Sequence, residues 1–501
     1  MKKTFKTICL FLLMSSLIFA SGSSEPKPKI ANNIQNSNTV ESPLDHISPT
    51  TTEIPTIQNV EEDKNTTKLD ENIRTNLNSL YSIYSLINTY SINELDQNKA
   101  FDEQASALVN ALGDKYSVYI AKDEMQDFEE LNLGTYSGIG SYILKQNPKN
   151  INSEDPETYM IKIESPFPDG PSDRAGLKAN DLISAIDGES VNALTGTEAS
   201  NKLKGKEGTS VTLTINRGNQ VFDISLKREL VKVPSVVYDI VNNHIGYLRI
   251  NQFIIGTDVD VATAIQNMLN QGMESLIIDL RNNGGGLVTD ATNIANLFLN
   301  GQKILTTQSK KTLKENIKIT LSSKDTLVPM DFPLVVIVNG GTASSSEILT
   351  GALQDNKRAT VIGNQTFGKG VMQQLYSIKD AIIKLTIAHY YTPNGTDINK
   401  IGITPDVLVK DHELSDEEIK QYETIMNENL ISNYVDKNPK YTKENVENFV
   451  KTFDEKDVYK PFLYSLVRNE YLYRMDYNDR PKFDINYDEY LKTAVEYLDK
   501  Q

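Results

Sequence analysis

The first regular pattern of hydrophobic and polar residues begins at Leu69. From there to Ile87, apolar residues recur every three or four positions, which predicts an amphipathic helix. A second helical pattern, "FDEQASALVNALGD", ends at Gly113, because glycine commonly terminates a helix. We therefore expect residues 67–133 to form a helical N-terminal region.

The pattern changes to short strand-like segments over residues 134–229. Strands are predicted in "GTYSGIGSYIL", "YMIKIESPF" and "LISAIDGESV". The segment "SVTLTINRGNQVFDISLKR" predicts a hairpin that turns at Arg217, Gly218 and Asn219. A short helix followed by a turn is expected in "GPSDRAGLKANDLI". This region is therefore predicted to be a small β-rich domain.

Strands and helices alternate from Val236 to Asp406. The strand patterns are "HIGYLRI", "SLIIDLR", "PLVVIVN", "ATVIG" and "IKLTIAHYY", and the helical ones are "DVATAIQNMLNQG", "LVTDATNIANLFL" and "SSEILTGALQD". Such alternation is typical of an α/β fold, which we expect over residues 230–409. The charged, tyrosine-rich residues 410–501 predict further helices.

The first 66 residues have a different composition. Three lysines precede an apolar stretch that ends near Phe19 and is followed by small residues, which predicts a secretory signal over residues 1–20. Residues 21–66 are rich in Ser, Asn, Thr, Pro and Glu and are predicted to be a disordered linker. We expect an exported protein, extracellular or associated with the cell envelope. If the signal segment were retained, it would tether the protein to a membrane.

Charge and cysteine content exclude several functions. The net charge of −16 argues against a nucleic-acid partner, because phosphate backbones require a basic surface. The only cysteine, Cys9, lies inside the signal segment. A mature chain would therefore have no disulfide, no catalytic thiol and no thiolate metal site. We expect neither a metal nor another cofactor.

Candidate catalytic chemistry begins with "GGTASSSE", where three serines follow a buried strand pattern. A hydroxyl nucleophile requires a nearby base, and Lys369, flanked by glycines, is one candidate because desolvation would lower its pKa. Gln373 would orient the amine if the following segment were helical. A solvated lysine in a surface loop is equally compatible with this segment. The other candidate base is His389, for which no orienting Asp or Glu is evident.

A glycine loop supplies the third element of the candidate site. In "LIIDLRNNGGGLV", three glycines follow a predicted buried strand and expose backbone N–H groups, as oxyanion holes require. A phosphate-binding loop is the competing interpretation, but the loop lacks the spaced Gly-Lys-Ser/Thr pattern.

The order of these motifs resembles the carboxyl-terminal processing peptidases, over about residues 70–409. This resemblance implies an α/β (α+β) peptidase core, residues 230–409, with an inserted β-rich PDZ domain, residues 134–229, and helical N- and C-terminal regions. It rests on eight segments: "LGDKYSVYI", "GIGSYIL", "GPSDRAGLKANDLISAIDGESV", "LIIDLRNNGGG", "NGGTASSSEILTGALQD", "TFGKGVMQ", "YYTPNG" and "IGITPDV".

The resemblance also implies roles for individual residues. Ser344 would be the nucleophile and Lys369 the base, with Gln373 as the supporting glutamine. Backbone N–H groups would bind the oxyanion and the substrate's C-terminal carboxylate. The implied oxyanion donors are Gly284 or Gly285 together with Ser345, and the implied carboxylate-binding loop is Gly138, Ile139 and Gly140.

Two positions depart from the family pattern. Ser345 stands where alanine is common, which places a second hydroxyl beside the nucleophile, and Thr342 replaces the usual first serine. The chain is therefore expected to be a serine endopeptidase whose partner is a polypeptide bound by its C-terminus. A homodimer is a further expectation, because some family members dimerise through helical ends. The alternatives are an inactive PDZ-bearing scaffold protein and a hydrolase that depends on His389.

Overall fold

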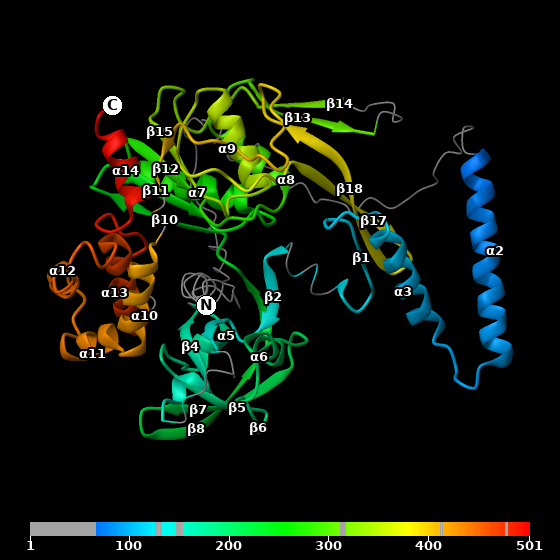
Figure 1. Ribbon diagram of the computed structural model, residues 1–501, viewed down its shortest axis with the longest axis horizontal. Helices are drawn as coiled ribbons and strands as arrows, with labels where there is room; N and C mark the ends of the chain where they lie inside the picture. Colours follow the sequence, from blue (N-terminus) through cyan, green and yellow to red (C-terminus); the bar gives the residue numbers. More distant parts are fainter. Residues whose placement is uncertain are drawn as a thin grey trace, which may run out of the picture.

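A computed structural model describes residues 67–501, except 126, 127, 129, 131, 132, 147–151, 153, 168, 311–316, 411, 413 and 476–478. The expected signal segment and linker lie outside the described residues. The chain forms a central α/β core, a β-rich domain below it, a group of C-terminal helices to one side and an N-terminal arm on the other (Figure 1).

The core is built on a six-stranded sheet. Its first two strands are antiparallel, and the remaining neighbours are parallel. The strands, in spatial order, are β10 (Val236–Val241), β11 (Ile245–Ile250), β12 (Ser275–Asp279), β15 (Leu334–Val338), β16 (Thr360–Gly363) and β19 (Val407–Leu408).

Both faces of this sheet are covered by helices. Alternate residues of β12 and β15 point to opposite faces, so the continuous apolar runs of these strands are buried on both sides. One face is covered by helix α14 (Glu489–Leu498), which packs through Leu491 and Val495 against Ile277 and Ile337. The opposite face packs against α7 (Thr257–Asn270), α8 (Val288–Asn296) and α9 (Ser345–Asp355).

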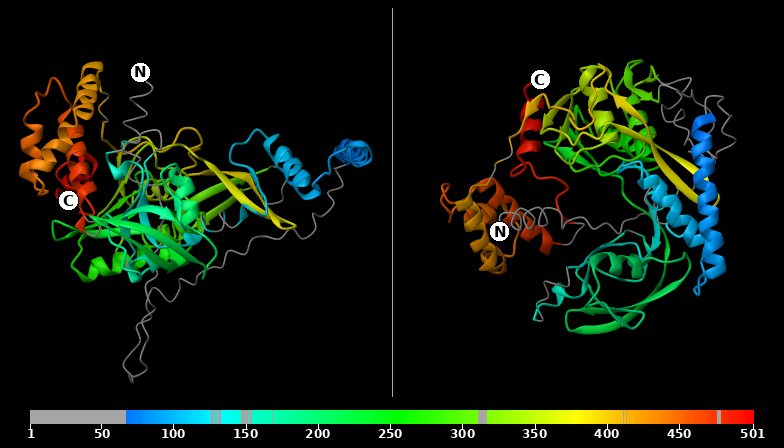
Figure 2. Two further views of the ribbon diagram at one scale, coloured as in Figure 1. Left: turned by 90° about the horizontal axis from the view of Figure 1, so that it is seen from below. Right: turned by 45° about the vertical axis from the view of Figure 1, so that its right-hand side comes forward.

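A second sheet carries the N-terminal arm. Its long strand β18 pairs with β17 as a hairpin, with β1 near its start and with β13 at its end, and β13 pairs with β14. Helices α3 and α2 lie beyond this hairpin, and α2 is farthest from the core (Figures 1 and 2). The elements are α2 (Thr67–Tyr90), α3 (Gln97–Asn110), β1 (Val118–Ile120), β13 (Lys303–Ser309), β14 (Ile317–Leu321), β17 (Val371–Ile378) and β18 (Ala381–Tyr391).

The amphipathic helix expected from Leu69 is present as α2. Its apolar side chains are not covered, however: Leu77, Tyr81 and Leu86 are all more than half exposed. Within the described residues, no helix has the length and hydrophobicity that crossing a membrane requires.

The β-rich domain has its own hydrophobic core, which includes Ile161, Ile183 and Leu213. Its hairpin turns where predicted, with Gly218 at φ +57°. Strand β2 (Thr135–Gly138) pairs with β9 (Glu229–Lys232) where the domain joins the core. The other elements are β3 (Ser141–Leu144), β4 (Ile161–Pro166), α5 (Pro171–Arg174), β5 (Leu182–Ile186), β6 (Glu189–Ser190), α6 (Gly196–Leu203), β7 (Ser210–Arg217), β8 (Gln220–Lys227) and the 3-10 helix η3 (Pro156–Thr158).

The C-terminal helices also form a separate core, with Tyr422, Val446 and Val467 buried. An ion pair between Arg480 and Glu164 of β4, at 3.3 Å, connects this region to the β-rich domain. The helices are α10 (Asp416–Asn427), α11 (Leu430–Lys437), α12 (Lys443–Val450) and α13 (Lys460–Arg474).

Candidate active site

The sheet topology brings the predicted catalytic segments together. The glycine loop, the serine cluster and the lysine loop follow β12, β15 and β16, which are adjacent parallel strands. Their carboxyl ends lie at the same edge of the sheet, which is where α/β proteins commonly bind ligands.

Ser344 lies in a strained turn immediately before α9. Its φ of +57° and ψ of −119° are rare for a residue with a side chain, and such strain often occurs at functional sites. The hydroxyls of the two neighbouring serines donate hydrogen bonds to backbone carbonyls: Ser345 Oγ to Gly286 O at 2.8 Å and Ser346 Oγ to Asn283 O at 2.9 Å. The geometry therefore favours Ser344 over its two neighbours as the nucleophile.

Lys369 is half-buried beside Tyr116, with its Nζ 4.8 Å from the centroid of that ring. Burial lowers the pKa of Lys369, and the positive charge of Lys384 lowers it further. The negative charges of Glu347 and Asp114 raise the pKa of Lys369, whereas the positive charge of Lys115 lowers it. The amine is therefore easier to deprotonate than an exposed lysine, as a general base requires.

Glu347 connects the serine turn to the lysine loop. Its carboxylate is fully buried and accepts hydrogen bonds from the backbone N–H of Ser344 at 2.8 Å and of Lys369 at 2.9 Å. It also accepts from Gly368 N at 2.7 Å and Thr366 Oγ1 at 2.6 Å. Sequence analysis missed this residue, although Ser344 and Glu347 have the Ser-x-x-Glu spacing of a capping box.

Tyr390 is another residue that sequence analysis missed. Its hydroxyl donates to the backbone carbonyl of Lys369 and also interacts with the side chain of Ser344. Burial raises the pKa of Tyr390, and Glu347 raises it further, so the phenol stays protonated and can donate. The residue therefore contacts both members of the predicted catalytic pair.

The glycine loop lies against the nucleophile. A Cβ atom on Gly285 would lie 2.7 Å from Ser344 Cβ and 2.9 Å from Ser345 N, so only glycine fits. The N–H of Gly285 donates to Asn283 Oδ1 at 2.9 Å and is unavailable while that bond lasts. Among the described residues, the N–H groups of Gly284 and Ser345 have no acceptor, which leaves them available as oxyanion donors.

Arg281 fixes the strand end from which this loop starts. Its guanidinium donates to Asp279 at 2.6 Å and, across the sheet edge, to Asp488 at 2.7 Å, just before α14. Burial alone would raise the pKa of Asp279, but the charge of Arg281 leaves it below its ordinary value. The glycine loop is therefore anchored by a residue from the far end of the chain.

The structure corrects the local argument for Gln373. The segment after Gly370 forms strand β17 rather than a helix, because it pairs with β18 along its whole length. The side-chain amide of Gln373 donates to Val371 O and Thr386 Oγ1, both at 3.3 Å. The helical spacing predicted between Gln373 and Lys369 is therefore wrong, and an orienting role for Gln373 stays a prediction from the family resemblance.

His389 lies on the other face of β18 from Tyr390, because consecutive strand residues point in opposite directions. Its side chain is 46% exposed. Asp397, which sequence analysis did not identify, lies near it, but the Nδ1–Oδ2 distance of 4.0 Å is too long for a hydrogen bond. The geometry does not favour a histidine-dependent hydrolase.

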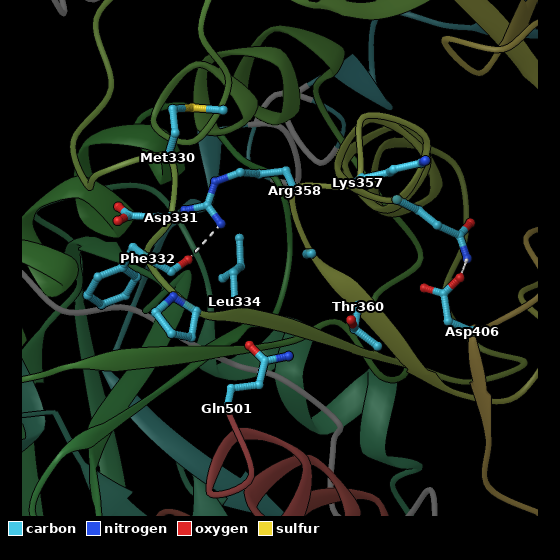
Figure 3. Close-up of a pocket in the computed structure, with 12 residues that line it drawn as sticks. Met330, Asp331, Phe332, Leu334, Lys357, Arg358, Thr360, Asp406 and Gln501 are labelled. Atoms are coloured by element: carbon cyan, nitrogen blue, oxygen red, sulfur yellow. Dashed lines mark hydrogen bonds between the residues drawn. The ribbon is translucent and has the colours of Figure 1, made fainter.

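A cavity of about 350 Å³ lies at the opposite edge of the sheet (Figure 3). It is lined by Leu334 and Thr360, which begin β15 and β16. The buried guanidinium of Arg358 donates to the carbonyl oxygens of Phe298, Phe332 and Pro329, so it holds the surrounding loops together. Within the described ranges, no cluster of three or more His, Cys, Asp or Glu side chains could hold a metal ion.

Comparisons with known proteins agree with this architecture. Residues 244–409 match peptidase family S41, and residues 162–217 match the PDZ domain. A carboxy-terminal-processing protease of Bartonella bacilliformis is 33% identical over 377 residues, which cover 74% of this chain and 83% of that protein. A probable CtpA-like serine protease of Staphylococcus aureus is 33% identical over 342 residues, covering 68% of this chain and 66% of that protein.

The solved structure of a photosystem II D1 C-terminal processing protease is also similar. It is 27% identical, with a TM-score of 0.40, over 65% of this chain and 86% of that chain. The fold and the family matches define a serine protease with an inserted PDZ domain. The chain belongs to peptidase family S41, among the carboxy-terminal-processing proteases. The predicted family and fold class are thereby confirmed, and the protein is an enzyme rather than a scaffold.

Proposed function

We propose that this protein is an exported endopeptidase that cleaves peptide bonds with a Ser344–Lys369 pair after recognising a substrate by its C-terminus. The observation that carries the proposal is the Glu347 carboxylate, which binds the backbone N–H groups of both Ser344 and Lys369. One buried charge thus positions both members of the pair. Groups held in fixed relative positions lower the barrier to reaction, since their ordering has been completed before the substrate binds.

The reaction follows from these positions. Ser344 Oγ attacks the scissile carbonyl carbon while the neutral amine of Lys369 accepts its proton. The N–H groups of Ser345 and Gly284 stabilise the oxyanion. Lys369 then donates the proton to the leaving amine, which leaves an acyl-enzyme. Water attacks this ester, again with Lys369 as base, and releases the new C-terminus and free Ser344.

We expect cleavage to increase with pH through the lowered pKa of Lys369. Below that pKa the amine is protonated and cannot accept a proton, so activity is lost as the pH falls. Lys384→Gln removes a positive charge that lowers this pKa, and it should move the rise to higher pH. The measurement is kcat/KM for a fluorogenic peptide from about pH 5 to pH 10.

The control for this profile is Ser344→Ala, which should stay inactive at every pH. Full wild-type activity in mild acid would contradict the proposal that deprotonated Lys369 is the general base. An unchanged profile in Lys384→Gln would show that the titrating group is not Lys369.

The PDZ domain is proposed to bind the substrate's C-terminus. Among the described residues, strand β3 pairs with β4 alone in its sheet, so its other edge could accept an added strand. Gly138 ends strand β2, and Ile139 and Gly140 connect it to β3; the backbone N–H groups of this segment would suit a carboxylate, with Gly140 at φ +67°. A C-terminal peptide would therefore pair with β3 and place its carboxylate at the loop.

Amidation of a peptide substrate tests this recognition. Hydrogen bonds to a charged group contribute about 1.5 to 3 kcal/mol each, so removing the carboxylate charge should raise KM roughly tenfold or more. The assay compares one peptide with a free C-terminus and its amidated twin on the full enzyme. Equal kcat/KM values for the two peptides would refute carboxylate capture.

Export is proposed from the basic and apolar pattern of residues 1–20. A membrane tether through a retained signal segment stays a prediction. A homodimer also stays a prediction, and the exposed apolar side chains of α2, such as Leu77 and Tyr81, favour it.

A further inference from the structure

A tyrosine from outside the peptidase core reaches the candidate active site. Tyr116 lies between α3 and β1, in a segment that belongs to neither the peptidase match nor the PDZ match. Lys369 Nζ lies 4.8 Å from the centroid of its ring. Among the described residues, this amine has no side-chain or backbone acceptor within hydrogen-bond distance. The aromatic face therefore takes the place of a hydrogen-bond partner.

The turn that carries Tyr116 is fixed to the β17–β18 hairpin. Asp114 accepts hydrogen bonds from Tyr116 N at 3.1 Å and from Ser117 Oγ at 2.6 Å. Ser117 Oγ accepts in turn from the backbone N–H of Thr386, on β18, at 3.0 Å. Strand β1, which follows directly, pairs with β18. The position of the ring therefore depends on the same hairpin whose first strand begins just after Lys369.

An aromatic ring distinguishes the two protonation states of a lysine. Its face is negative and attracts a cation within about 6 Å of the ring centroid, but it does not attract a neutral amine in this way. In the proposed reaction the amine of Lys369 is neutral before the attack and becomes an ammonium as it takes the proton of Ser344. A partner for the charge that forms during the reaction lowers the barrier.

A second ammonium contacts the same ring. Lys115 Nζ lies 4.8 Å from the centroid of Tyr116 and 5.8 Å from that of Phe367. Lys115 is exposed, whereas Lys369 is half-buried. Water therefore solvates the charge of Lys115, and the ring matters more to the ammonium that water reaches less well.

We propose that Tyr116 is a positioning residue for the cleavage reaction, and that the face of its ring holds the ammonium of Lys369 as it forms. This inference rests on the Ser344–Lys369 pair proposed above. The phenol hydroxyl is not required for this role, because the face of a phenylalanine ring also attracts cations. Activity should therefore follow the ring and not its hydroxyl.

The ring acts on the pKa of Lys369 in two opposite directions. As apolar cover it lowers the pKa, and as a face that attracts cations it raises the pKa. Leucine keeps much of the cover but has no such face, so Tyr116→Leu should lower the pKa. If the ring were only a cover, its loss would admit water and raise the pKa. The charged groups that also act on this amine, besides its burial, are Lys384 on β18, Glu347 on α9, and Lys115 and Asp114 on the turn of Tyr116.

The test is the pH dependence of kcat/KM for a fluorogenic peptide, measured on the full chain from about pH 5 to pH 10. Tyr116→Phe keeps the ring and should stay within about twofold of the wild type. Tyr116→Leu should lower the plateau at high pH by up to about fivefold and move the midpoint down by about 0.7 pH unit. A trifluorinated phenylalanine at this position keeps the shape of the ring but weakens its negative face, so its profile should lie between those two.

Tyr376→Leu is the matched control, because it removes a half-buried tyrosine near the far end of β17 and should change neither the plateau nor the midpoint. Thermal unfolding establishes that each variant is folded. A midpoint that stays or moves up in Tyr116→Leu, or a wild-type profile with the fluorinated ring, overturns the inference and leaves the catalytic pair standing. If Lys369→Ala keeps wild-type activity, the pair itself fails and the inference fails with it.

Discussion

Replacing Lys369 with alanine is expected to reduce kcat by at least roughly a thousandfold, because loss of a catalytic base typically costs several orders of magnitude. His389→Ala should retain most of the activity, since that side chain lies on the face of β18 opposite to Tyr390, which contacts Ser344. The measurement is kcat and KM for a peptide substrate, with thermal unfolding to establish that both variants are folded. Comparable losses in the two variants would restore the histidine as a candidate base.

The second large effect is expected at Glu347. Glu347→Ala removes the acceptor of four hydrogen bonds: three buried ones, from Ser344 N, Gly368 N and Thr366 Oγ1, and a part-buried one from Lys369 N. Each unpaired buried donor costs about 1 to 3 kcal/mol, so the free energy of unfolding should fall by about 4 kcal/mol or more. Activity should also fall sharply, because the serine turn and the lysine loop lose their common anchor.

Glu347→Gln removes the negative charge of the side chain and keeps nearly the same shape, so it tests the two contributions separately. The amide keeps one acceptor oxygen but introduces a buried NH₂ group that faces backbone donors, so we expect an intermediate loss of stability. Glu444→Ala is the matched control, an exposed glutamate in the first turn of α12, and should cost less than about 1 kcal/mol. Denaturant unfolding measures these differences. Near-wild-type stability of Glu347→Ala would show that the loops do not depend on this carboxylate.

The sequence is sufficient to predict the parts of the site that depend on local pattern. Ser344, Lys369 and the glycine loop follow strands with continuous apolar runs, and parallel strands bring such loops to one edge. The helix that follows Ser344 begins and ends where "SSEILTGALQD" predicts. The hairpin at Gly218 is similarly local, because its turn residues lie between two strand patterns.

Features that depend on distant contacts could not be predicted in the same way. The four-residue spacing of Lys369 and Gln373 suggests a helix, but the segment is extended because it pairs with β18, which follows it after a turn near Lys379. Glu347 resembles an ordinary helix cap until the fold brings the N–H groups of Gly368 and Lys369 to it.

The position of α14 imposes a time order on the maturation of the enzyme. Synthesis proceeds from the N-terminus, and domains form as their residues emerge. Ser344, Lys369 and the glycine loop therefore exist well before Asp488, the partner of Arg281, has been added. Until the residues of α14 follow, the sheet face with Ile277 and Ile337 lacks its cover. The glycine loop is thus synthesised before the residue that anchors it, and among the described elements of the core the helix that covers this sheet face is added last.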